Sequence, residues 1–189
     1  MSSSYRNTLN LWLSTLEVKA FNVHDIGGSQ EKVKDRVKSW DVEHYTIADL
    51  ADPHAESPQP DIVMDLNKKY QGDIMPQEMI FCLEVFDYVY DPMTAFKNIQ
   101  RWLDHGGVAW VTFPFAYPLH NPYEDDSLRY TEFGIRRLAK AAYLDIEQII
   151  IRKPETDLLN RFYVGERMRA LKHYDHNYTG FIVKFKNQI

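Results

Sequence analysis

Four acidic side chains stand at or near the ends of four successive apolar runs. They are Asp25, Asp49, Asp65 and Glu84. Carboxylates accept hydrogen bonds from hydroxyl and amine groups. Each one alone has an ordinary alternative, as a solvated loop residue or a helix cap. Together they predict a pocket that binds a ligand rich in hydroxyl and amine groups.

A second group of reactive side chains lies in "FPFAYPLHNPYEDDSLRYTEFG", residues 113–134. His120 is the candidate general base, because an imidazole titrates near neutral pH. Arg129 is a candidate catalytic residue in the same segment. The structural alternative stays open: His120 would then fix the loop, and Arg129 would pair with Asp125 or Asp126.

These side chains need elements that hold them in place. Short apolar runs predict strands at 21–26, 44–49, 61–65, 78–85, 108–115, 144–152 and 178–186. Helical spacing predicts helices at 3–19, 30–40, 91–107 and 131–143. Asp91 and Pro92 are typical of a helix start, Gly106–Gly107 of a helix end, and Thr131 opens the last helix.

Strands that alternate with helices predict an α/β fold, a mostly parallel sheet with helices on both faces. Ligands of such folds bind outside the carboxyl ends of the strands. Gly27 and Gly28 follow the first of these ends, where glycine permits positive φ and a close approach of the backbone to a ligand. The predicted helix at 30–40 would offer its N–H groups to an anion.

Composition indicates one globular domain over residues 1–189, with 44% hydrophobic and 26% charged residues. No apolar run approaches the ~18 residues of a membrane-spanning helix, so no membrane partner is expected. The first residues lack the pattern of a secretory signal. A single cysteine, Cys82, excludes an internal disulfide, and we therefore expect a cytoplasmic protein.

Charge is unevenly distributed along the chain. Residues 1–126 carry 10 Lys/Arg and 20 Asp/Glu, a net charge of −10, whereas residues 127–189 carry 12 and 7, a net charge of +5. A general nucleic-acid binder needs an extended basic face, so no nucleic-acid partner is expected. A small or anionic substrate near the basic third is compatible with this pattern, as is an ordinary solvated surface.

The ordered motifs resemble the class I S-adenosylmethionine-dependent methyltransferases, and more narrowly the group called methyltransferase type 11. The resemblance rests on "VHDIGGS", "YTIADL", "DIVMDL" and the run "IFCLEVFDYVYDPMTAFKNIQRWLDHGGVAWVTFPF". It covers roughly residues 20–150. It implies a Rossmann-like sheet of seven strands with the last strand antiparallel, and S-adenosylmethionine as the cofactor.

The resemblance also implies roles for individual residues. Asp49 would hold the ribose hydroxyls, and Asp65 with the backbone amide of Leu66 would meet the adenine amine. The turn at Gly27 and Gly28 would hold the methionine end. Asp25 and Glu84 complete the predicted cofactor site, for which no metal is required.

The sequence departs from the family pattern at three positions. Ser29 and Glu31 replace the second and third glycines of D-x-G-x-G-x-G, and Glu31 places a negative charge near the cofactor's carboxylate. Tyr88 replaces a histidine of many relatives; it can form hydrogen bonds, but a pKa of ~10 makes tyrosine a poor base.

Other readings therefore stay open. The protein could bind the cofactor without catalysis or serve as a scaffold. A nicotinamide-dependent enzyme is a weaker alternative, because the G-x-G-x-x-G fingerprint is absent.

The predicted acceptor is a small molecule or a sugar, methylated on a hydroxyl. Capsule- and glycan-associated relatives carry a similar run, which Pro114, His120, Asp126, Arg129, Tyr130 and Thr131 match. "NPYE" (121–124) is similar to a motif of adenine-N6 DNA methyltransferases but follows the wrong strand, so coincidence is the better interpretation.

The basic, aromatic segment 153–177 is predicted to be a lid, an oligomer contact or a plain surface helix. His173, Asp175 and His176 lack the further ligands of a metal site.

Overall fold

A single seven-stranded sheet organises the protein in the computed structural model, which describes residues 4–53, 57–153 and 178–189. The strand order is β3-β2-β1-β4-β5-β7-β6. Strands β1 to β5 pair in parallel, whereas β7 is antiparallel to both β5 and β6. The strands are β1 (Glu17–Ile26), β2 (Ser39–Asp49), β3 (Ile62–Val63), β4 (Gln77–Cys82), β5 (Leu103–Pro114), β6 (Leu144–Arg152) and β7 (Gly180–Asn187). The predicted α/β class and the antiparallel last strand are confirmed.

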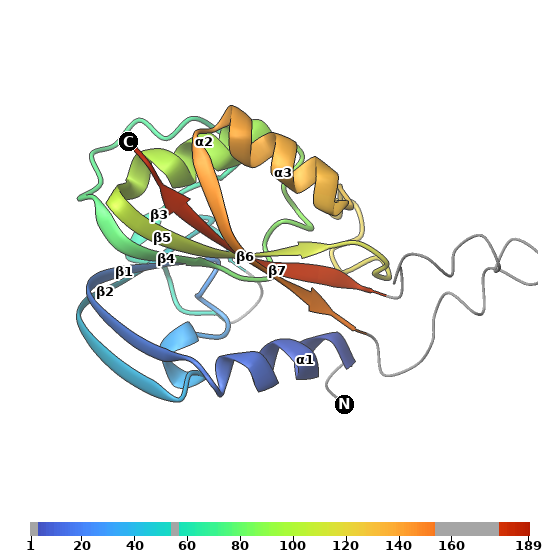
Figure 1. Cartoon of the computed structure of the whole chain (residues 1–189), viewed down its shortest axis with the longest axis horizontal. Helices are drawn as coiled ribbons and strands as arrows, with labels where there is room; N and C mark the ends of the chain where they lie inside the picture. The colour runs from blue at the N-terminus through green and yellow to red at the C-terminus, as the bar shows by residue number, and fades with distance from the viewer. Residues whose placement is uncertain (1–3, 54–56, 154–177) are drawn as a thin grey trace, which may run out of the picture.

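Helices cover both faces of the sheet (Figure 1). The helices α2 (Pro92–Trp102) and α3 (Glu132–Ala141) lie on one face, and α1 (Ser4–Leu13) lies on the other. Phe96 and Ile135 anchor the first pair in the larger core, while Leu9 and Leu13 anchor α1 in the smaller one. All four side chains are buried. None of the described helices is long and apolar enough to cross a membrane.

The helix predicted at 30–40 is wrong. Only a single 3-10 turn, η1 (Val33–Asp35), lies between β1 and β2 in this part of the chain. Ser39 pairs with Glu17 at the start of β1, so the connection must run back along the ten residues of β1, which cover about 30 Å. Residues 27–38 in a helix would reach only about 18 Å. The parallel register therefore requires an extended connection.

The N-terminal helix is shorter than predicted. It ends at Leu13 rather than at residue 19, and residues 17–19 belong to β1. The hydroxyls of Ser14 and Thr15 donate to the carbonyls of Leu11 and Trp12, and such bonds compete with helical pairing at a helix end.

The two later helices begin as predicted. Asp91 caps α2 by accepting from the Thr94 amide at 3.1 Å, and Thr131 caps α3 by accepting from the Gly134 amide at 3.1 Å. The predicted end of α2 at Gly106–Gly107 is wrong, because the helix ends at Trp102 and β5 begins at Leu103.

Gly107 has a different function in the sheet. A Cβ there would lie 2.6 Å from the carbonyl oxygen of Gln77, where the β4–β5 register shifts. The glycine therefore permits a close approach of two strands at an irregularity. Residues 154–177 of the segment predicted as a lid, with His173, Asp175 and His176, lie outside the described residues.

Candidate active site

A cavity of about 700 Å³ opens at the carboxyl ends of β1, β2 and β4. The strand order reverses between β1 and β4, which is where open α/β sheets bind ligands, and the volume suits a small molecule. Most of the predicted site residues line it: Asp25, Gly27, Asp49, Asp65, Leu66, Glu84, Tyr88 and His120. Gly28 and Arg129 are not among the described residues that line it.

The glycine turn is shaped by its two glycines in different ways. Gly27 lines the cavity at a φ of 78°, and a Cβ there would lie 2.3 Å from Cγ2 of Val85. A Cβ on Gly28 would lie 2.4 Å from the carboxylate of Asp25. Gly27 therefore keeps the cavity wall open, whereas Gly28 makes room for the carboxylate behind the turn.

Asp25 braces this turn from inside the protein. Its Oδ2 accepts from the Tyr45 hydroxyl at 2.5 Å and from the Val33 amide at 2.8 Å. Burial raises the pKa of Asp25 to about 6, against the lowering effect of these two hydrogen bonds. The carboxylate thus ties the turn to β2 and to the start of the 3-10 turn η1.

The next two strand ends present carboxylates to the cavity. Asp49, the last residue of β2, accepts from the Ser29 amide at 3.3 Å and from its neighbour Leu50 at 2.8 Å. Asp65, beyond β3, accepts from the Asn67 amide at 2.9 Å and pairs with Lys68 at 3.1 Å. Burial opposes these interactions, but they hold the pKa of Asp65 below its ordinary value.

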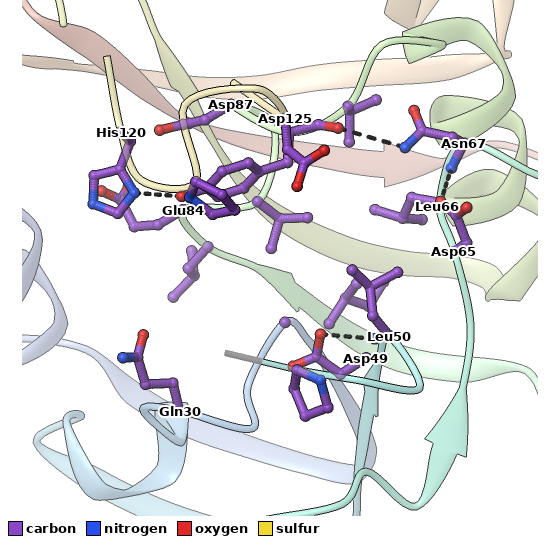
Figure 2. A pocket seen from close by; sticks show the side chains of 18 of the residues that line it. Gln30, Asp49, Leu50, Asp65, Leu66, Asn67, Glu84, Asp87, His120 and Asp125 are labelled. Atoms are coloured by element: carbon purple, nitrogen blue, oxygen red, sulfur yellow. Dashed lines mark hydrogen bonds between the residues drawn. The ribbon is translucent and has the colours of Figure 1, made fainter. Parts of the chain in front are cut away.

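Figure 2 shows where these residues lie around the cavity. Gln30 and Asp49 lie on one side, Asp65 and Leu66 on a second, and His120 faces them from a third. The strand-end carboxylates that the sequence predicted to gather are thus brought around a single cavity.

Two arginines neutralise the charge of Glu31. Arg6 Nη1 lies 3.0 Å from Glu31 Oε1, and Arg36 Nη1 lies 3.7 Å from Oε2. Asn10 accepts two further hydrogen bonds from Arg36, at 2.8 and 3.2 Å. All three charged residues line the cavity. The negative charge expected from Glu31 is therefore part of a cluster whose net charge is positive.

Glu84 is held in an uncommon backbone conformation. Its φ is 57°, its amide donates to Oγ1 of Thr112 at 2.6 Å, and Arg152 donates to both of its carboxylate oxygens, at 2.6 and 3.2 Å. Arg152 is buried. A left-handed conformation of a side-chain-bearing residue persists where its surroundings impose it, which is common at functional sites.

Tyr88 and His120 meet on the other side of the cavity. The Tyr88 hydroxyl donates to the Asn121 carbonyl at 2.7 Å and also contacts Nδ1 of His120. A carbonyl oxygen can only accept, so the single hydroxyl proton of Tyr88 lies toward Asn121. His120 Nδ1 must then carry a hydrogen and donate it to the tyrosine oxygen. In a neutral imidazole this assigns the basic lone pair to Nε2.

The loop that carries His120 is closed by Asp126 and Arg129. Asp126 accepts from the His120 amide at 2.6 Å and binds Arg129 through two hydrogen bonds, at 2.5 and 2.8 Å. Arg129 also donates to the carbonyls of Tyr117 and Pro118. Arg129 thus pairs with Asp126 rather than Asp125 and organises the loop from outside the cavity lining.

Sequence reasoning missed three residues of the site. Asn67 joins two loops, since its Oδ1 accepts from the Tyr90 and Asp91 amides at 2.8 and 3.0 Å. Arg152 pairs with Glu84 across the sheet. Asp87 lines the cavity while only 6% exposed, and burial, with the charge of Glu84, raises its pKa to about 7. Its place three residues after Glu84, in "EVFDY", was the available signal for Asp87.

Several solved structures with the same architecture are methyltransferases. The chain superposes on an S-adenosylmethionine-dependent methyltransferase from Mesorhizobium loti with a TM-score of 0.60 and 14% identity, covering 97% of this chain and 96% of that one. It superposes on the N-methyltransferase NodS from Bradyrhizobium japonicum WM9, bound to S-adenosyl-L-homocysteine, with a TM-score of 0.59 and 16% identity, covering 97% of this chain and 86% of that one.

A third solved structure gives the same result. For the protein in complex with the Trm112 methyltransferase activator of Haloferax volcanii, the TM-score is 0.63 and the identity 15%, covering 98% of this chain and 90% of that one. No protein-family model matches the sequence, and no curated protein matches it. The chain therefore has the fold of the class I S-adenosylmethionine-dependent methyltransferases.

Proposed function

We propose that the protein transfers a methyl group from S-adenosylmethionine to a small molecule or sugar that presents a hydroxyl or an amine. One observation carries this proposal. In a methyltransferase fold, the glycine turn and the carboxylates of Asp49 and Asp65 line one cavity of about 700 Å³ at the switch point of the sheet.

The residues present fit this cofactor. Gly27 has no side chain and lines the cavity, so the turn would present its backbone to a bound ligand. Asp49 would accept hydrogen bonds from the ribose hydroxyls. Asp65 and the Leu66 amide would meet the adenine. Because the helix after the turn is absent, Arg6 and Arg36 supply the positive charge at the methionine end. When bound, the cofactor supplies an electrophilic methyl group on a sulfonium.

The acceptor side contributes positioning and a base. His120 Nε2 would take the proton of the acceptor, while Tyr88 keeps the imidazole in the required tautomer through Nδ1. Tyr88 stays protonated and is not itself a base, since burial raises its pKa further above the ordinary value. A positioned base contributes roughly 10²- to 10⁴-fold to such reactions, and orientation of the two reactants contributes the rest.

The proposal is tested by a crystal structure with S-adenosylhomocysteine. The expected density places the ribose on Asp49 and the adenine beside Leu66. A thermal melt with NAD serves as a comparison, because a larger stabilisation by NAD than by S-adenosylmethionine would indicate a different nucleotide cofactor. An empty cavity at millimolar ligand, or a ribose far from Asp49, would refute the proposal.

A catalytically silent cofactor-binding or scaffold protein is the second candidate. The single 3-10 turn in place of a helix after Gly28 favours it, because fewer backbone N–H groups then converge on the methionine end. This candidate predicts either that S-adenosylmethionine does not bind, or that it binds but no hydroxyl or amine acceptor is ever methylated. Methyl transfer to any acceptor rules it out.

A further inference from the structure

Asp87 is a buried carboxylate that faces the cavity without a partner. It is 6% exposed and lines the cavity, and among the described residues its carboxylate takes part in no hydrogen bond or ion pair. Figure 2 shows it on the same side of the cavity as His120 and Asp125. A buried carboxylate without a partner is costly to the fold, which points to a ligand that supplies the missing charge.

The surroundings of Asp87 are acidic and aromatic. Glu124 and Asp125 line the same cavity and are exposed. The tyrosines Tyr88, Tyr90 and Tyr117 line it as well. Carboxylates attract a cation, and tyrosine rings bind one through their faces.

The described arginines in and near the cavity already form ion pairs with carboxylates other than Asp87. Arg129 pairs with Asp126, and Arg152 pairs with Glu84. The arginines that line the cavity, Arg6 and Arg36, both pair with Glu31. Among the described residues, the carboxylates of Asp87, Glu124 and Asp125 therefore give their part of the cavity lining a net negative charge.

We infer that the methyl acceptor is a cationic amine, held by the Asp87 carboxylate, rather than a neutral hydroxyl. The inference rests on the proposed function and names its substrate class. An alcohol would leave Asp87, Glu124 and Asp125 without a counter-charge, and a carboxylate or phosphate on the acceptor would be repelled by all three.

The proposed reaction balances in protons and electrons with the residues already described. The ammonium N–H bond breaks toward His120 Nε2, which becomes an imidazolium, and the electron pair stays on nitrogen. That lone pair forms the new N–C bond while the electrons of the breaking C–S bond remain on sulfur. The imidazolium then passes its proton to solvent. No oxidant, reductant or metal is needed.

The test compares benzylamine with benzyl alcohol and benzoate, three probes of similar shape, by NMR titration at pH 8. We expect benzylamine to bind at least about tenfold more tightly than benzyl alcohol, and benzoate not to bind. Asp87→Asn removes this preference, and Asp125→Asn reduces it about twofold to threefold because its carboxylate is exposed. Asp145→Asn, an exposed carboxylate on β6, is the matched control and keeps the full preference.

The result also depends on whether Asp87→Asn folds. Asp87→Asn should fold, because it removes a buried charge and keeps the side-chain volume, and a thermal melt checks this. Equal affinities of amine and alcohol, or an unchanged preference in Asp87→Asn, overturn the inference. Binding of S-adenosylhomocysteine to the same samples tests the proposed function separately. If the unmodified protein prefers the amine but does not bind S-adenosylhomocysteine, methyl transfer is refuted while the amine site stands.

Discussion

Tyr88 and His120 are hydrogen-bonded across the loops that follow β4 and β5, with the tyrosine proton directed at the Asn121 carbonyl. This contact joins the tyrosine of "EVFDY" to the histidine of the loop at residues 113–134, and it leaves Nε2 as the basic nitrogen of a neutral His120.

Tyr88→Phe should release the tautomer of His120. Without the tyrosine oxygen, Nδ1 has no acceptor there, and the Nε2–H tautomer gains population. Nitrogen-15 NMR of the ring would show this, and methyl transfer should slow about tenfold or more, while S-adenosylhomocysteine affinity stays unchanged. An unaltered tautomer ratio would show that Tyr88 does not orient the ring.

Much of this arrangement could be predicted from the sequence, because apolar strands and acidic strand ends are local patterns. Asp49, Asp65 and Glu84 were expected around one ligand, and they line one cavity. The helix predicted at 30–40 does not form, because the β1–β2 register requires this connection to run back along the whole of β1. That register is a long-range constraint. Val33 and Val37 have helical spacing, yet the chain there must be extended to reach Ser39.

The partners of the site residues could not be predicted for the same reason. Arg152 meets Glu84 across 68 positions of the chain, and Arg6 meets Glu31 only because α1 packs under the sheet. The environment of Asp87 arises from tertiary burial, which no short motif encodes. Sequence patterns thus located the strand ends, while the pairing of charges required the fold.

Glu31→Gln should raise the affinity for S-adenosylhomocysteine. In the structure Glu31 pairs with Arg6 and Arg36 and so competes with the cofactor's carboxylate for them. Removing one negative charge at this partly exposed site should strengthen binding by about threefold to tenfold. Calorimetry measures the effect, and Glu43→Gln, exposed on β2, provides the control. Weaker binding in Glu31→Gln would mean that Glu31 supports the site rather than opposing the cofactor.

Benzylamine affinity should rise with pH between about 6 and 8. The pKa of Asp87 is raised to about 7, by burial and the charges of Glu84 and Asp126, against Arg129 and Arg152. Below that pH the carboxyl is neutral and cannot pair with an ammonium, which itself stays charged to about pH 9. NMR titrations across this range should show about a tenfold gain. The Asp87→Asn variant keeps every other titrating group, so its pH profile measures their contribution to the rise. An identical rise in that variant would exclude Asp87 as the cause.

His24 should make the fold sensitive to acid. It is buried in β1, and neither ring nitrogen has a hydrogen-bond partner in the described structure. Burial lowers its pKa from 6.5 to about 4, so the unfolded chain binds a proton first as pH falls through this interval. Between pH 7 and 4.5 the free energy of unfolding should lose about 2 to 3 kcal/mol through this residue.

The variant His24→Leu isolates that contribution. Urea unfolding at both pH values should show that His24→Leu lacks this loss of stability. Asp25 and Asp87 have raised pKa values and act in the opposite direction, with stability falling as pH rises, but they are common to both proteins. The same pH dependence in both proteins would contradict the assignment.

In the proposed function, Asp49 holds the ribose of S-adenosylmethionine at the end of β2. Calorimetry with S-adenosylhomocysteine on the unmodified protein, Asp49→Ala and Asp41→Ala measures whether it does. Asp41 lies on the same strand, in an exposed pair with Lys19. We expect clear binding by the unmodified protein, a loss of at least about tenfold in Asp49→Ala, and no change in Asp41→Ala. No binding at millimolar ligand, or equal binding by all three proteins, would contradict it.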